Sequence, residues 1–256
     1  MLEGMKMATQ GMLAMMAKQD VVANNLANVG TTGYRKDTLL VSSFNDVLNK
    51  EMGFTGTDTQ GGYMPVGGGI ESSGGLFTQT ATHYAQGSLK ATDNNFDLAL
   101  DDNGKGFFTI QSPDGIKFTR NGAFRLSTTG YLITADGSFV LGQKGPIKVK
   151  GTDFKVNNDG EVIVGDKGID KLLITSFADT RVLQKVGAAN FVASSGGAVS
   201  GDCKIQQGYL EMANVNAVKE MVDMMTIMRA YEANQKILQT QDQMLGKSTN
   251  EVGRVK

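Results

Sequence analysis

The sequence predicts an α+β protein, with two terminal α-helices that pair as a coiled coil and a central antiparallel all-β domain between them. Apolar residues recur every three or four positions at both ends of the chain, which is typical of helices that pack on a partner helix. Between the ends, short apolar runs alternate with glycine-containing turns. Twelve of the 14 methionines lie in residues 1–16 and 212–244, so the two ends also share an unusual composition.

The C-terminal stretch 211–254 carries the more regular of the two patterns. Asn214 and Asn216 are good helix caps, and no proline follows them, so a helix of about 30 residues can continue to Gly246. The seam that we predict for this helix consists of Ala217, Met221, Met224, Met228, Tyr231, Gln235, Leu238, Asp242 and Leu245.

The first 30 residues repeat this spacing. Their predicted seam consists of Met1, Met5, Ala8, Met12, Met15, Gln19, Val22, Leu26 and Val29. A methionine stripe at helical spacing is more often part of a domain core than of an interface. Here the intervening chain reads as a self-contained β protein with little helix to pack against, which favours pairing of the two termini.

Additional apolar residues widen the C-terminal stripe beyond one seam. They are Val218, Val222, Met225, Ala230, Ala233, Ile237 and Met244. One partner helix cannot cover such a wide face, and methionine adapts to several neighbours. We therefore predict a polymer interface, formed by Met5, Met12, Met15, Val22, Leu26, Met221, Met224, Met228, Tyr231, Leu238 and Leu245.

Changes in composition divide the chain into four segments. The expected segments are an N-terminal helix at 1–34, an extended linker or hairpin at 35–75, the β domain at 76–207 and a C-terminal helix at 208–256. Asparagines and glycines in residues 23–35 suit a helix end followed by a tight turn. Residues 36–50 hold a short apolar element, and glycines cluster in residues 61–69.

The middle of the chain shows short strands separated by turn dipeptides. The clearest strands are residues 96–100, 106–110, 131–133 and 171–174. We expect hairpin turns at Asp114-Gly115, Asn121-Gly122, Asp136-Gly137 and Asp159-Gly160. These signals predict a compact antiparallel domain of roughly 130 residues.

Several functional classes are disfavoured by composition. A formal net charge of −1 gives no reason to expect nucleic acid, and no apolar run approaches the roughly 18 residues of a membrane span. The N-terminus lacks the pattern of a cleaved signal peptide. Cys203 is the single cysteine and His83 the single histidine, so neither an internal disulfide nor a choice of catalytic histidines exists. We expect both residues to be structural, although their roles are open.

Acidic loops at 93–95, 101–104 and 157–160 resemble calcium loops only superficially, because none has the full ligand spacing followed by a glutamate. Hairpin turns explain them better. A glycan-cleaving enzyme would need two carboxylates facing one cleft. Asp97, Asp101 and Asp102 form the densest acidic group, and strand alternation puts some of them on opposite faces. We therefore expect no enzyme, no cofactor and no metal.

Three blocks of sequence resemble the bacterial flagellar rod and hook proteins. The first block is residues 23–28 with 32–35, the second is residues 98–108 with 118–122, and the third is residues 208–216 with 220–222 and 229–234. The resemblance covers nearly the full chain in the right order. The residues that carry the terminal signatures are Asn24, Asn25, Leu26, Asn28, Thr32, Gly33, Asn214, Asn216, Arg229, Tyr231 and Glu232.

The resemblance implies a structural subunit of the flagellar basal-body rod, which polymerises through its terminal helices into a hollow drive shaft between motor and hook. It further implies export without a cleaved signal peptide, and contacts with itself, with other rod and hook proteins and with the export apparatus. Residues 140–147 and 250–254 look more like a proximal rod protein, and the regular C-terminal signature is similar to the distal rod protein as well. The resemblance therefore favours the proximal rod slightly over the distal rod. A secreted β-rich adhesin or calcium-binding module is the alternative, but it leaves both terminal helices without a purpose.

Overall fold

A computed structural model of the chain describes residues 2–43, 70–71, 76–149, 154–165, 167–194, 198–200 and 203–252. The chain forms two compact units. The helical unit comprises Met1–Leu26, Asp37–Ala81 and Asn216–Lys256, and the β unit comprises Ala27–Lys36 and Thr82–Val215. This arrangement confirms a mixed α+β protein with terminal helices and a mostly antiparallel β domain. Most of the predicted linker at 35–75 lies outside the described residues.

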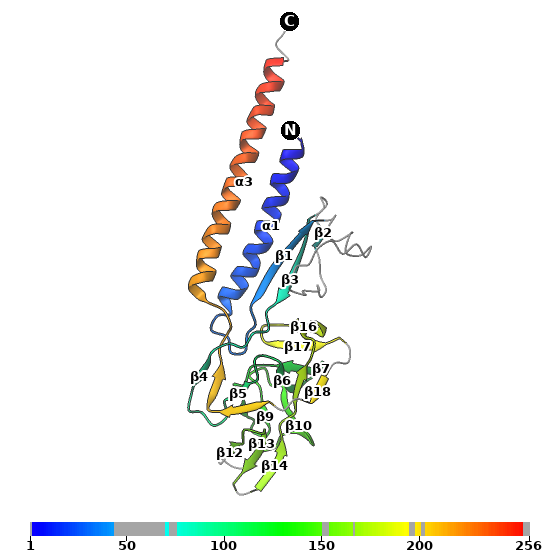
Figure 1. Cartoon of the computed structure of the whole chain (residues 1–256), viewed down its shortest axis with the longest axis vertical. Helices are drawn as coiled ribbons and strands as arrows, with labels where there is room; N and C mark the ends of the chain where they lie inside the picture. Colours follow the sequence, from blue (N-terminus) through cyan, green and yellow to red (C-terminus); the bar gives the residue numbers. More distant parts are fainter. Residues whose placement is uncertain are drawn as a thin grey trace. The chain divides into compact units, whose positions relative to one another are not determined.

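The helical unit contains two long helices that lie side by side and run in opposite directions (Figure 1). Helix α1 spans Leu2–Ala27 and helix α3 spans Ala217–Val252. Asn216 caps α3, because its side-chain oxygen accepts a hydrogen bond from the backbone N–H of Lys219 at 3.1 Å. The predicted cap at this position is therefore confirmed.

Contacts between α1 and α3 recur at multiples of seven residues. A methyl group added to Gly4 would lie 2.7 Å from Nε2 of Gln241, and one added to Gly11 would lie 3.2 Å from Nδ2 of Asn234. At the other end of the pair, Nδ2 of Asn25 donates a hydrogen bond to Oε2 of Glu220 at 3.3 Å. The two helices thus keep one antiparallel register over their common length.

This contact line differs from the predicted seam by one residue at every second position. The buried and half-buried positions of α3 that recur at spacings of three and four residues are Ala217, Glu220, Met224, Ile227, Tyr231, Asn234, Leu238, Gln241 and Leu245. Met221 and Met228, which the pattern placed in the seam, are exposed, whereas their neighbours Glu220 and Ile227 are buried. Both of two adjacent positions satisfy the seven-residue spacing, and α3 uses Glu220, Ile227, Asn234 and Gln241 in place of Met221, Met228, Gln235 and Asp242.

Three strands complete the described part of the helical unit. They are β1 (Asp37–Ser43), β2 (Ile70–Glu71) and β3 (Leu76–Thr82), in the order β1-β3-β2. Asn25 holds the start of β1 beside α1, since its amide donates to the carbonyl oxygen of Asp37 at 2.8 Å and accepts from the N–H of Asp37 at 2.9 Å. The predicted apolar element at 36–50 therefore begins as a strand.

Strand β6 (Gly106–Ser112) runs through the middle of the β unit. Its partners are β7 (Gly115–Thr119), β10 (Phe139–Gly142) and β15 (Ile174–Phe177). Phe107 and Phe108 are both fully buried, in two different apolar clusters on the opposite faces of the strand. A continuous apolar run, rather than an alternating one, is what a strand covered on both faces requires.

The remaining strands surround this centre, and every pairing whose register is described is antiparallel. They are β4 (Leu89–Ala91), β5 (Leu98–Asp101), β8 (Arg125–Leu126), β9 (Leu132–Ile133), β11 (Gly145–Pro146), β12 (Phe154–Val156), β13 (Glu161–Val164), β14 (Lys167–Lys171), β16 (Leu183–Val186), β17 (Asn190–Ala193), β18 (Ala198–Ser200), β19 (Lys204–Gln207) and β20 (Tyr209–Glu211). A short 3-10 helix, η1, spans Thr180–Val182.

Three of the four predicted hairpin turns join paired strands. Asp114-Gly115 lies between β6 and β7, Asp136-Gly137 between β9 and β10, and Asp159-Gly160 between β12 and β13. The prediction at Asn121-Gly122 is wrong. There the Leu98 N–H donates to the carbonyl oxygen of Gly122 at 3.1 Å, and the backbones approach so closely that a side chain on Gly122 would overlap the Leu98 carbonyl.

Replacing Gly122 with alanine therefore tests this close approach. We expect Gly122→Ala to lower the free energy of unfolding by about 3 kcal/mol or more, because the Cβ meets backbone that cannot rotate away. Gly137→Ala is the matched control, since Gly137 has a φ of 79° but open space around its Cα. It should cost only about 1–2 kcal/mol. Urea unfolding of both variants checks the difference, and equal costs would contradict it.

Candidate functional site

Four charged side chains meet inside the β unit, where three strands and the N-terminal connection end. Asp102 directly follows β5, Arg120 directly follows β7, and Glu211 ends β20. Arg35 belongs to the segment 27–36 that follows α1. The side chains of both arginines and of Glu211 have no exposed surface, and the side chain of Asp102 is 10% exposed. We call these four residues the charge cluster.

Glu211 lies at the centre of the charge cluster. Its Oε1 accepts hydrogen bonds from Nη1 of Arg35 at 2.6 Å and from the N–H of Gly87 at 2.8 Å. Its Oε2 accepts from Nη1 of Arg120 at 3.3 Å. Arg120 also forms an ion pair with Asp102, so two cations and two anions alternate and their formal charges cancel.

The charge cluster can be buried because most of its polar atoms have hydrogen-bond partners within the protein. Asp102 accepts from the N–H of Gly106 and, at 3.1 Å, from Sγ of Cys203. Arg35 donates to the carbonyl oxygen of Ala85 at 2.8 Å. Nε and Nη2 of Arg35 and Nε of Arg120 have no partner among the described residues. The cluster is therefore costly to assemble and depends on all of its members.

The environment shifts the pKa of two members downward. Burial opposes the charged form of Asp102, but Arg120 and the hydrogen bonds from Cys203 and Gly106 outweigh it and hold the pKa of this carboxyl below its ordinary value. Burial lowers the pKa of Arg35, and Glu211 opposes that effect. An arginine stays protonated in proteins, so Arg35 still contributes a full positive charge.

The N-terminal signature folds onto the charge cluster. Gly33 has a φ of 69°, its N–H donates to the backbone oxygen of Glu211 at 2.8 Å, and a side chain there would overlap the backbone of Arg120. Thr32 donates to Oδ1 of Asn121 at 2.6 Å. Tyr34 is fully buried, with Nζ of Lys185 3.9 Å from its ring centroid. Glycine is thus required where this segment crosses the chain that carries Arg120.

The C-terminal signature is bound into the β unit in the same way. Asn214 accepts from the N–H of Lys36 at 2.7 Å and donates to the carbonyl oxygens of His83 and Ala85, both at 2.8 Å. Asn214 was expected to cap α3, but it joins three segments instead. The two connections that lead into α1 and α3 are therefore both held by hydrogen bonds within the β unit.

The other signature residues divide between structural contacts and surface. Asn28 accepts from the hydroxyl of Thr31 at 3.2 Å, whereas Asn24 is exposed. Arg229 and Glu232 are exposed on α3. His83 donates its backbone N–H to the oxygen of Lys36 at 2.8 Å. Asn25 is buried and holds both Glu220 and the start of β1, as described above.

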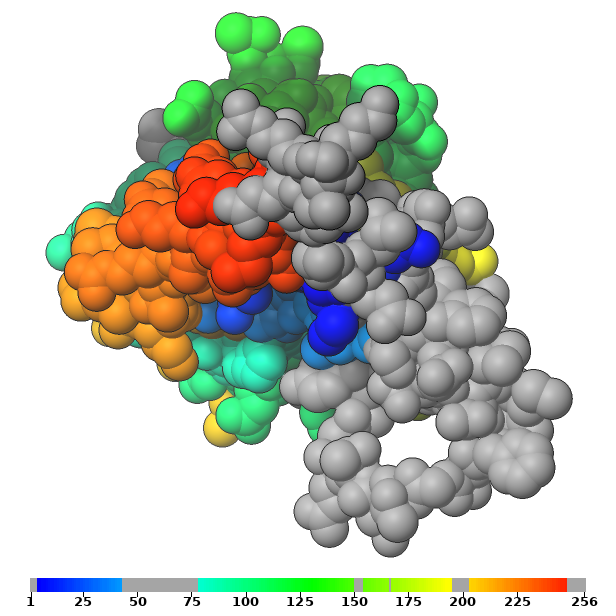
Figure 2. Space-filling view, turned by 90° about the horizontal axis from the view of Figure 1, so that it is seen from above, coloured from blue at the N-terminus to red at the C-terminus, as the bar shows by residue number. Residues whose placement is uncertain are grey.

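The predicted interface residues occupy different environments in the helical unit. Val22 is buried, and Met221 and Met228 are exposed. The half-buried members of the set are Met5, Met12, Met15, Leu26, Met224, Tyr231, Leu238 and Leu245. Large apolar side chains outside that set are exposed as well, among them Leu13, Met16, Val218, Val222 and Met225. The space-filling view shows the orange part of α3 with an uncovered surface (Figure 2).

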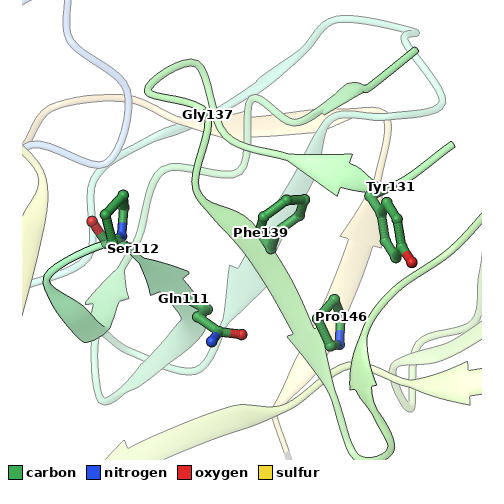
Figure 3. A pocket seen from close by; sticks show the side chains of 7 residues that line it. Gln111, Ser112, Tyr131, Gly137, Phe139 and Pro146 are labelled. Atoms are coloured by element: carbon green, nitrogen blue, oxygen red, sulfur yellow. The ribbon is translucent and has the colours of Figure 1, made fainter. Parts of the chain in front are cut away.

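A groove of about 520 Å³ lies in the β unit (Figure 3). Its lining consists of Gln111, Ser112, Pro113, Tyr131, Gly137, Phe139 and Pro146. The Tyr131 and Phe139 rings pack edge to face with centroids 5.5 Å apart. The lining contains neither histidine, cysteine nor a carboxylate, so it offers no nucleophile with a neighbouring base.

Across the described residues, no three or more His, Cys, Asp or Glu side chains come together as a metal site would need. None of the described helices combines the length and the hydropathy that a membrane span requires.

Sequence reasoning missed the charge cluster. Arg35, Arg120 and Glu211 all lie within the signature blocks, but no role was assigned to them, and Asp102 was interpreted as part of a hairpin turn. A weak signal was present, because each of these charges lies one or two residues from a large apolar or aromatic side chain. Such charges need partners. The sequence does not say which charge pairs with which.

The β unit holds both connections that lead into the helices, and both helices expose large apolar residues. This arrangement is typical of a structural protein that assembles with other proteins. Sequence comparisons agree with this class. The family described as "Flagella basal body rod protein" matches residues 5–35, "Flagellar hook protein FlgE/F/G D1 domain" matches residues 103–164, and "Flagellar basal body rod FlgEFG protein C-terminal" matches residues 206–251.

Relatives align over almost the whole chain. The flagellar basal-body rod protein FlgG of Bacillus subtilis is 32% identical, with 98% of this chain and 99% of the relative covered. FlgG of Buchnera aphidicola subsp. Schizaphis graminum is also 32% identical, over 96% and 98%. The flagellar hook-basal body complex protein FlhO of B. subtilis is 27% identical over the full length of both chains. The chain belongs to the flagellar basal-body rod protein family, and it is a structural protein of the flagellar basal body rather than an enzyme.

Removing the central carboxylate should be severe. We expect Glu211→Gln to lower the free energy of unfolding by about 3–5 kcal/mol, because two buried guanidiniums lose their shared anion. The control is Asp179→Asn, which breaks the pair of Asp179 with Arg181 at 2.9 Å on the surface. That change should leave stability within experimental error. Denaturant unfolding measures both variants, and similar results for the two would contradict the importance of the cluster.

The lowered pKa of Asp102 predicts a pH dependence with a defined sign. The unfolded carboxyl has a pKa near 3.8 and the folded one lies lower, so on acidification the unfolded chain takes up the proton first. The contribution of the Asp102 carboxylate to the free energy of unfolding is complete above pH 3.8 and is lost as the pH falls through the folded-state pKa. Asp102→Asn should therefore lose less stability than the wild type below pH 4. Urea titrations at several pH values check this, and an equal loss of unfolding free energy in the two proteins on acidification would refute it.

Proposed function

We propose that this rod subunit polymerises helically through its terminal helices into a hollow shaft that transmits torque from motor to hook. In this proposal α1 and α3 pair as a coiled coil within each copy, and the apolar side chains left on their outer faces bind neighbouring copies. The observation that carries the proposal is the exposure of large apolar residues on α3, from 45% at Met221 to 68% at Val218.

Two physical features support polymerisation. Burying about 40 Å² of apolar surface contributes about 1 kcal/mol, so several such residues together can drive association. The contact line between α1 and α3 holds Glu220, Asn234 and Gln241, and Oε1 of Gln241 accepts no hydrogen bond among the described residues. Because polar residues occupy this contact line, the pairing of α1 with α3 within one copy gains little free energy, which favours additional contacts with neighbouring copies.

The family also bears on partners and location. Rod and hook proteins assemble with one another in the basal body, and this chain shares their three sequence blocks. We propose that the subunit reaches this location through the flagellar export apparatus without a cleaved signal peptide. For the position along the rod, residues 140–147 and 250–254 favour the proximal part slightly, and this preference stays a prediction.

The alternative function, a secreted adhesin or calcium-binding module, explains fewer observations. It accounts for the glycine-rich turns of the β unit but not for α1 and α3, which overlap the first and last family matches at residues 5–35 and 206–251. The acidic loop at 101–104 also has another role, because Asp102 pairs with Arg120.

Electron microscopy and sedimentation of the concentrated protein test polymerisation. We expect helical filaments from the wild type, and at least a tenfold smaller sedimenting fraction from Met225→Lys, because a lysine in an apolar contact must be desolvated. Gln243→Lys is the control, since Gln243 is exposed on the same face of α3, 18 residues further on. Wild-type protein that stays monomeric at high concentration would contradict the proposal.

A further inference from the structure

The outer face of α3 changes character at Arg229. Before this residue it carries an apolar stripe, which we call the α3 stripe: Val218, Met221, Val222, Met225 and Met228, all 45–68% exposed. Spacings of three, four and seven residues place these side chains on one face. Beyond them the same face carries the exposed polar residues Arg229, Glu232, Lys236 and Gln243. The α3 stripe therefore covers the first three turns of the helix, and the exposed apolar residues further along α3, Ile237 and Met244, lie about 40–60° to one side of it.

Helix α1 carries a smaller apolar surface, away from its contact with α3. Leu13 and Met16 are 49% and 50% exposed, and Leu13 lies about 200° around the helix from the contact residue Gly11. Exposed charges flank Leu13 seven residues away on each side, Lys6 before it and Asp20 after it. We call this surface the α1 outer face.

We infer that the α3 stripe of one copy binds the α1 outer face of a second copy in an antiparallel arrangement, with Leu13 beside Met225 and Met16 beside Val222. The inference rests on the proposed polymerisation and names the contact that produces it. In this register Lys6 lies beside Glu232, and Asp20 lies beside Val218 and its neighbour Lys219. Opposite charges thus border the apolar contact at both ends.

The register differs from the one inside a single copy. Within one copy, Gly11 faces Asn234, which places Leu13 at the level of Glu232. Between copies Leu13 lies at the level of Met225, seven residues earlier on α3, and the neighbour is therefore displaced by about 10 Å along the helices.

Such a contact joins the α3 stripe of one copy to the α1 outer face of the next, with a shift along the helices. One α3 stripe and one α1 outer face therefore stay free at the two ends, so further copies can be added to form a filament. Two α3 stripes bound to each other would instead close as a dimer.

Disulfide trapping across copies tests the inference. In a Cys203→Ser background, separate Leu13→Cys and Met225→Cys proteins are mixed, polymerised and oxidised, and linked peptides are identified by mass spectrometry. The matched control pairs Leu13→Cys with Gln243→Cys, which has the same exposure class and helical face as Met225. We expect linked chains from the first mixture to exceed those from the control mixture, and those from either protein alone, at least tenfold.

The outcomes separate the two hypotheses. Filaments in which Met225→Cys links mainly to itself, or in which Leu13→Cys links equally to both partners, would overturn the inferred contact and leave polymerisation intact. Wild-type protein that forms no filament would overturn both.

A charge exchange gives a second measurement that introduces no thiol. Lys6→Glu or Glu232→Lys alone should raise the critical concentration for polymerisation roughly fivefold, and the two together should restore it. Failure of the double variant to recover, while each single variant is impaired, would exclude the proposed register.

Discussion

The shared carboxylate of Glu211 is the interaction on which the β unit depends most. Two guanidiniums without exposed surface, those of Arg35 and Arg120, need a negative partner, and Glu211 serves both. An uncompensated buried charge costs several kcal/mol, so the segments that carry the three residues cannot separate cheaply. These segments come from the N-terminal connection, the middle of the β unit and the C-terminal connection. A single ionic arrangement thus binds three distant parts of the chain together.

The helical unit is held together by contacts of a different kind. Its helices meet through small and polar side chains such as Gly11, Asn234 and the buried pair of Asn25 with Glu220. A polar group at a seam position costs stability and specifies register. Much of the apolar surface of α3 faces away from α1 instead. Contacts within one chain therefore set the alignment of the helices, and much of the apolar surface of α3 stays exposed.

Local signals in the sequence accounted for much of the fold. Strands such as Gly106–Ser112 are visible as apolar runs, and Asp114-Gly115 has the turn chemistry that a hairpin needs. The same local chemistry was misleading at Asn121-Gly122, because the glycine there serves a close approach to Leu98. Asn214 was misjudged for a similar reason, since a capping side chain can bond any nearby backbone and its partners come from residues 36, 83 and 85.

By itself, the sequence determined the class of protein, the two terminal helices, the antiparallel β domain and the membership in a rod family, because periodicity, turns and signature blocks are properties of neighbouring residues. Only the tertiary structure decided which charges pair, which face of α3 turns toward α1 and which methionines remain exposed. Adjacent helical positions such as Glu220 and Met221 are both compatible with the seven-residue spacing. The choice between them depends on the partner surface, and that surface is formed by residues about 200 positions away.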